Sequence, residues 1–202
     1  MSNVSRHQMR LFTDTDAWNG GSIELLCLFR EPDTAVQAKC SAAVWSWPQL
    51  QGPYARRDQE STEQKLAAPG SEGARYGIAS LPDAIGTVAF QTSFVDDDDG
   101  LWLYAGLPLG SLSRVLPVGA FPFGESKAES WEHVLHAWFF SLAEHIRKQV
   151  PFERGVIGWL TTGEVEELVA GYVPADRFHS YLVCSSTELI CHPQNRKSAA
   201  IE

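Results

Sequence analysis

The sequence predicts an α+β protein, in which a mostly antiparallel sheet of about six to eight strands packs on one long amphipathic helix, with short helices besides. The first observation behind this prediction is a helix-periodic apolar pattern over 126–150. The second is that strand-like segments cluster before this helix and again after it, which is typical of α+β proteins rather than of doubly wound ones. The chain has no internal repeat, so we expect a single domain over 1–202.

The sequence indicates both the apolar face of the long helix and its two ends. Ser126 and Glu129 have the spacing of a capping box, and Pro151 marks the stop. The large apolar side chains recur at the three- and four-residue spacing of one helix face: Trp131, Val134, Leu135, Trp138, Phe139, Leu142, Ile146 and Val150. Such a face must be covered, so the strands are expected to supply an apolar sheet surface.

Two strands are expected near the N-terminus, at 22–30 and 38–47, with a turn around Pro32 between them. The segment 49–73 is polar, contains several glycines and prolines, and has no periodicity. It is long for a plain loop, so we interpret it as a polar excursion that is mobile, forms a binding loop or contains a weak helix.

The clearest hairpin lies in the middle of the chain. Residues 86–95 and 101–107 are rich in β-branched and aromatic side chains, and the turn between them ends in Gly100, which suits a positive φ. A short helix is expected within 108–116.

The segments after the long helix complete the predicted sheet. Strands are expected at 155–160, 178–185 and 187–192, with one or two helical turns at 163–170. We expect the last residues, 193–202, to form a C-terminal tail.

Composition and charge exclude several classes of function. Hydrophobic content of 44% and charged content of 20% are those of an ordinary globular protein. The net charge is −9 and the basic residues are scattered, so we expect no nucleic-acid partner and no anionic membrane surface as partner. The N-terminus lacks the apolar core of a secretory signal, and no apolar run reaches membrane-spanning length, which favours a cytoplasmic location.

The four cysteines give no sign of a metal or redox centre. Cys27, Cys40, Cys184 and Cys191 lie in hydrophobic runs without Cys-x-x-Cys spacing, which indicates buried thiols in a reducing compartment; disulfides are the less favoured alternative. His179, Cys184, Cys191 and His192 are zinc-binding residue types, but their spacing is unlike that of a zinc site. We expect no metal and no cofactor.

Four consecutive acids stand at the tip of the predicted hairpin: Asp96, Asp97, Asp98 and Asp99. A calcium loop requires an acid at its twelfth position, and counting from Asp96 that position is Leu107. The run is therefore interpreted as a solvated turn, with docking of a basic partner as the functional alternative.

The face of the long helix opposite the apolar one carries the other candidate residues. Glu129, His133, His136, Phe140 and Arg147 share one stripe, which is expected to face water. Charge pairing on an exposed face explains most of them, and a metal site is the disfavoured alternative because only one such helix is predicted. Phe140 is unusual on a polar stripe and is a candidate anchor for a protein partner.

No nucleophile elbow, Ser-x-x-Lys motif, dinucleotide-binding motif or P-loop occurs in the chain. The favoured hypothesis is a non-catalytic cytoplasmic protein-binding module, which neutralises a basic partner as toxin-immunity proteins do; that analogy rests on charge and size. The expected contact residues are Asp96, Asp97, Asp98, Asp99, Glu129, His133, His136 and Phe140.

Two alternatives stay open. The first is a small-molecule-binding protein or an enzyme, a hydrolase or transferase, with a pocket between the sheet and the 49–73 excursion. Its candidate lining residues are Trp159, His179, Tyr181 and His192. The second is a homodimer formed through an edge strand or through the exposed helix face.

Overall fold

A computed structural model describes residues 11–30, 34–68, 73–118, 128–159, 161, 165–185 and 187–196, with the backbone alone for 34, 128–130 and 165. It contains one antiparallel sheet of eight strands in the order β2-β3-β4-β5-β1-β6-β7-β8. The predicted α+β class and strand number are confirmed. The strands are β1 (Ser22–Phe29), β2 (Leu50–Tyr54), β3 (Arg75–Leu81), β4 (Gly86–Asp97), β5 (Gly100–Pro108), β6 (Arg154–Trp159), β7 (Ser180–Cys184) and β8 (Leu189–His192).

Strand β1 lies near the middle of the sheet, between β5 and β6, and all eight of its residues are buried. Leu25 and Cys27 belong to the main core, whereas Leu26 and Leu28 belong to a second cluster on the other face. A strand with both faces covered needs a continuous apolar run, which is what this segment has.

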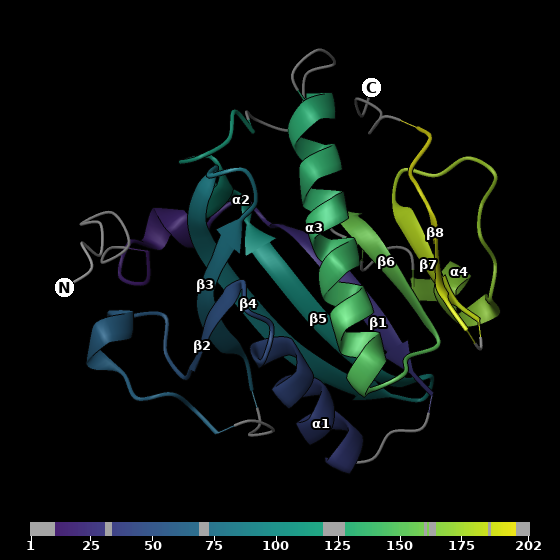
Figure 1. The fold of residues 1–202 in the computed structure, drawn as a ribbon, viewed down its shortest axis with the longest axis horizontal. Coiled ribbons are helices and arrows are strands. Elements are labelled where there is room, and N and C mark those ends of the chain that lie inside the picture. Colours follow the sequence, from purple (N-terminus) through teal and green to yellow (C-terminus); the bar gives the residue numbers. More distant parts are fainter. Residues whose placement is uncertain are drawn as a thin grey trace.

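Two helices, α1 (Thr34–Trp45) and α3 (Ala128–Gln149), lie side by side across one face of the sheet (Figure 1). The prediction of one long covering helix is therefore not confirmed, because α1 shares that role. The strand predicted at 38–47 is wrong. Cys40, Ala43 and Val44 follow the helical spacing and are buried in the main core, and the alanines of this segment are strong helix formers.

Two smaller segments pack on the opposite face of the sheet. Helix α4 (Val165–Ala170) places Leu168 against the cluster that includes Leu26, Trp102 and Tyr181. The N-terminal segment covers the other side of this face, where Phe12 packs with its neighbours on β2 and β3.

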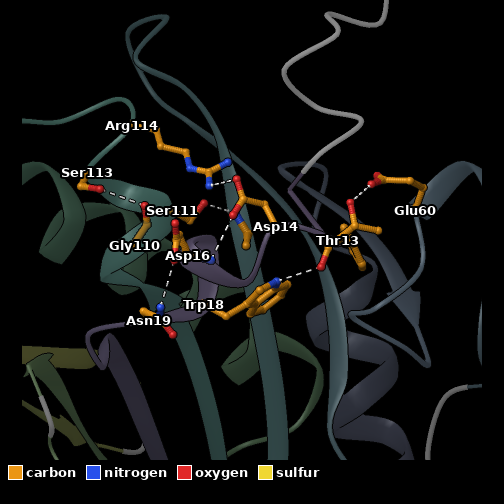
Figure 2. Close-up of polar contacts among 12 residues, drawn as sticks. Thr13, Asp14, Asp16, Trp18, Asn19, Glu60, Gly110, Ser111, Ser113 and Arg114 are labelled. Carbon is orange, nitrogen blue, oxygen red and sulfur yellow. Dashed lines mark hydrogen bonds and ion pairs between the residues drawn. The ribbon is translucent and has the colours of Figure 1, made fainter.

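The N-terminal segment is fastened at the short helices η2 (Thr15–Trp18) and α2 (Leu109–Leu112) (Figure 2). Arg114 forms an ion pair with Asp14 at 2.6 Å, and the other carboxylate oxygen of Asp14 accepts from the backbone N–H of Asp16 at 3.0 Å. A Cβ atom on Gly110 would lie 1.9 Å from the carbonyl oxygen of Asp16, so this close approach requires glycine.

The segment predicted as a polar excursion contains the edge strand β2 and the short helix η3 (Ser61–Glu63). Beyond β2 the chain turns back, and the N–H of Ala67 donates to the carbonyl of Pro53 at 2.8 Å. The hydroxyl of Thr13 donates to Glu60, which joins this segment to the N-terminal one.

The remaining element predictions are mostly confirmed: the strand at 22–30, the hairpin, the short helix in 108–116, the helical turns at 163–170 and the three late strands all occur with small shifts of their ends. Strand β3 was not predicted. Residues 193–196 of the predicted tail are hydrogen-bonded to the body of the protein. No helix in the described residues is long and apolar enough to cross a membrane.

Candidate functional site

A pocket of about 500 Å³ lies where the far side of α3 faces the end of the sheet. We call it the α3–β8 pocket. Helix α3 contributes Glu132, His133, His136, Ala137 and Phe140; the rest of the lining is Ser180 of β7, Cys191 of β8, and Pro193, Gln194, Asn195 and Arg196.

The wall formed by 193–196 is held in place by Arg177. The carbonyl of Arg177 accepts from the N–H groups of Asn195 and Arg196 at 3.0 and 2.9 Å, and its guanidinium donates to the carbonyl of Pro193 at 3.0 Å. The side-chain oxygen of Asn195 accepts from the N–H of Arg177 at 2.7 Å. These bonds turn the chain back after β8, so that it closes one side of the pocket.

His136 lines this pocket and is partly buried. Its Nδ1 lies 2.8 Å from Oγ of Ser180, and that Oγ accepts from the N–H of Gln194 at 3.1 Å. Burial, and then the proximity of His179 and His133, lowers the pKa of His136 to about 4. The imidazole is therefore neutral at neutral pH, and the Ser180 hydroxyl is free to donate to Nδ1.

The expected solvent exposure of the stripe is correct for His133 and wrong for His136. Because β7 and β8 extend the sheet beyond α3, the far side of the helix has strands beneath it rather than water. Phe140 is half-buried and packs on the main core, and Arg147 donates to the carbonyl of Ser185 at 2.9 Å. Glu129 lies outside the residues whose side chains are described.

Ser180 and His136 form a hydrogen-bonded pair to which the described residues add no third side chain. A catalytic relay needs a group that orients the second ring nitrogen, and no hydrogen bond links Nε2 of His136 to another described residue. Ser180 is only 2% exposed. An imidazole with a pKa near 4 is also a weak base.

Within the part of the chain that the structure describes, no three His, Cys, Asp or Glu side chains are arranged to hold a metal ion, and this includes His179, Cys184, Cys191 and His192. All four cysteines are free thiols. Cys27 and Cys40 are buried, as predicted, whereas Cys184 and Cys191 are only half-buried.

The acidic hairpin tip uses one of its four carboxylates to fix its own backbone. Oδ1 of Asp97 accepts from the N–H groups of Asp99 and Gly100 at 3.0 and 3.2 Å, and from the indole N–H of Trp102 at 3.1 Å. Gly100 has φ of +138°, and a Cβ atom there would lie 2.6 Å from the carbonyl oxygen of Phe29. The positive φ predicted for this glycine is confirmed.

The other three acids of the tip are exposed. Among the described residues, none forms a hydrogen bond or an ion pair with the carboxylates of Asp96, Asp98 and Asp99. We use the term acidic tip for these three residues. They differ from Asp14, which is paired with an arginine.

Sequence reasoning missed a buried polar cluster around Glu24. This residue is 4% exposed, and its Oε2 accepts from both the N–H and the hydroxyl of Thr161 at 3.1 Å, while Oε1 accepts from the Tyr104 hydroxyl at 3.4 Å. Burial raises the pKa of Glu24 above its ordinary value, and burial together with the Glu24 charge raises the pKa of Tyr104 to about 12.

Glycines make room for this cluster on both neighbouring strands. Gly106 and Gly158 stand opposite Glu24 in the register, and added Cβ atoms would lie 2.4 Å from the Tyr104 hydroxyl and 2.0 Å from the His179 ring. The cluster ties Thr161, two residues after the end of β6, to the central strand. A glutamate inside an apolar strand was the available signal in the sequence.

The residues proposed to line a pocket with the 49–73 segment are not brought together with it. Trp159, His179, Tyr181 and His192 lie on or beside β6, β7 and β8, whereas 49–73 contains β2 at the opposite edge of the sheet. Tyr181 is fully buried, and the His179 ring contacts the carbonyl of Trp159 at 2.9 Å.

Comparisons with protein-family models, with curated proteins and with solved structures found no match to this chain.

Proposed function

We propose that the chain is a non-catalytic, cytoplasmic protein-binding module that engages a basic protein through its acidic tip. The observation that carries the proposal is the set of three exposed carboxylates, Asp96, Asp98 and Asp99, without a partner among the described residues and mounted on a turn that Asp97 fixes. A charged group already held in its binding geometry loses little conformational freedom on association.

The surroundings of the acidic tip support a basic partner. The chain has a net charge of −9, so its field attracts a basic protein over a distance and accelerates the encounter. Val95 directly precedes the tip and is 56% exposed, so an apolar contact adjoins the charges. Neutralisation of a toxic basic protein, in the manner of immunity proteins, fits this surface. The four free thiols suit a reducing compartment.

The test compares two variants with the same loss of charge. The tip variant carries Asp96→Ser, Asp98→Ser and Asp99→Ser; the control carries Glu63→Gln, Glu144→Gln and Glu166→Gln, three exposed glutamates elsewhere on the surface. Wild type and both variants are immobilised and exposed to extract of the source cells, and each basic protein retained by wild type is purified and titrated against all three.

We expect one basic protein to bind wild type and control with similar affinity. Its affinity for the tip variant should fall by about tenfold or more, and binding should weaken as salt is raised. If the tip variant and the control bind the partner equally weakly, the loss of affinity comes from net charge and not from the acidic tip. If the tip variant binds the partner as tightly as wild type does, the docking surface does not include the acidic tip, and the proposal is wrong.

A further inference from the structure

The outer edge of β8 presents backbone groups that β7 does not use. The N–H of Ser185 donates to the carbonyl of Glu188 at the turn between these strands. Because antiparallel partners alternate between bonded and non-bonded pairs, Ile190 and His192 direct their backbone groups toward β7, whereas Leu189 and Cys191 direct theirs outward. No described residue is bonded to those outward groups.

The α3–β8 pocket adjoins this edge. Cys191 belongs to both features: its backbone faces the free edge, and its side chain lines the pocket on the helix-covered face of the sheet. Phe140 and Ala137 of α3 line the pocket, and the His136 beside them, whose pKa burial lowers to about 4, is neutral at neutral pH. Phe140, Ala137 and Pro193 thus give the pocket an apolar part that suits an apolar side chain, while Glu132, His133 and Arg196 add polar groups to its lining.

We propose that the β8 edge and the α3–β8 pocket form one docking groove for an extended peptide segment of a partner protein. The segment pairs with β8 as a ninth strand and inserts a large aliphatic or aromatic side chain into the pocket. The outward N–H and C=O groups of Leu189 and Cys191 suit an extended backbone, and the apolar part of the pocket, at Ala137, Phe140 and Pro193, suits a side chain of that size. This groove is a different surface from the acidic tip.

Ile190 offers the added strand an apolar contact on the face of the sheet opposite the pocket. It is 38% exposed on an edge strand, where an added strand would cover it. Side chains of the bound segment would then alternate between the pocket on one face and Ile190 on the other.

The test uses a library of random linear peptides selected against the full chain, with the selected peptides titrated against variants by fluorescence anisotropy. Ala137→Arg fills the pocket from an exposed helix position. Ser141→Arg is its control, since it adds the same charge one turn along α3 at a position that does not line the pocket. Leu189→Pro removes an outward N–H, and Leu189→Ala keeps it. Thermal unfolding checks that each variant is folded.

We expect selected peptides to bind wild type, and Ala137→Arg and Leu189→Pro each to weaken binding by about tenfold or more. Ser141→Arg, Leu189→Ala and the triple tip variant should stay within about twofold of wild type, which separates this groove from the proposed docking of a basic protein.

The proposal is overturned if no peptide is enriched or if binding is insensitive to both Ala137→Arg and Leu189→Pro. It is also overturned if the tip variant abolishes peptide binding. Light scattering checks for a dimer. If the wild type is a dimer and Leu189→Pro is a monomer, the β8 edge binds a second copy of the chain, which contradicts the proposal.

Discussion

The outer backbone groups of the two edge strands, β2 and β8, differ in whether other residues hydrogen-bond to them. At β2, Pro53 has no N–H to offer, its carbonyl accepts from Ala67, and the chain beyond the strand turns back along it. At β8, the outward groups of Leu189 and Cys191 have no partner among the described residues, and a pocket adjoins them. Exposed edges invite pairing with other chains. Among the described residues, the chain closes one edge and leaves the other available, which supports the proposed place for an extended partner.

The packing between the helix layer and the sheet is tight near β2 and open near β8. The ring of Trp45 presses on Gly52 and Gly77, so that β2 and β3 meet the helix layer at close range. Behind β8 the corresponding space is the open pocket beneath α3. The β2 edge should therefore be stiff and the β8 edge compliant, and four changes test that difference.

The largest effect is expected at the closed edge, from Gly77→Ala. The added Cβ would lie 2.4 Å from Cζ3 of Trp45 and 2.6 Å from the carbonyl oxygen of Gln51, so ring and backbone must both move. We expect a loss of about 3 kcal/mol in the free energy of unfolding, measured by urea denaturation. A loss below about 1 kcal/mol would mean that this edge is as compliant as the other.

Acid should loosen the β8 side selectively. The pKa of His136 is about 4 in the folded chain against an ordinary value of 6.5, so between these values the unfolded state binds a proton that the folded state does not. The stabilisation is complete above pH 6.5 and is lost as the pH falls toward 4, by at most about 3 kcal/mol. The difference in unfolding free energy between wild type and His136→Gln, followed from pH 7 to 4, measures this loss. A pH-independent difference would contradict it.

A smaller effect is expected from Gln64→Ala in the cover of β2. Its amide donates to the carbonyls of Arg56 and Gln59 at 2.7 and 2.8 Å, and its side-chain oxygen accepts from the N–H of Arg56 at 3.0 Å. We expect a loss of about 1–2 kcal/mol and faster hydrogen exchange at the amide of Ala67. Gln59→Ala is the control, and equal acceleration by both would assign the effect to surface perturbation.

The smallest effect is expected from Ile190→Ala on β8. A side chain that is 38% exposed on an edge strand loses little contact on truncation, so the free energy of unfolding should fall by less than about 1 kcal/mol. Urea denaturation gives the value. A loss near that of Gly77→Ala would show that something already covers this strand.

The parts of the fold that could be predicted from the sequence are those with strong local patterns. Helix α3, strand β1 and the β4–β5 hairpin each have a period or a turn that can be recognised within one segment. The sequence of helix α1 favours a strand prediction because most of its apolar side chains are small and its alanines blur the pattern, although Cys40, Ala43 and Val44 follow helical spacing. Strand β3 contains Gly77 in its interior, which weakens its strand signal.

The candidate site was less accessible to prediction because its contacts join distant segments. Ser180 meets His136 across 44 residues of sequence, and Thr161 meets Glu24 across 137. The sequence pattern predicts that the stripe containing His136 faces water, but Phe140 packs on the main core and the exposure of His136 depends on how far the sheet extends past α3. That extent is a property of strand order, which local periodicity does not encode.

Residue-resolved amide hydrogen exchange along β8 is the most direct test of the open edge. We predict that the free chain shows fast exchange at Leu189 and Cys191 and slow exchange at Ile190 and His192, and that a peptide selected against the full chain slows the first two. Protection of Leu189 and Cys191 in the free chain at high dilution, where self-association is negligible, would contradict the account.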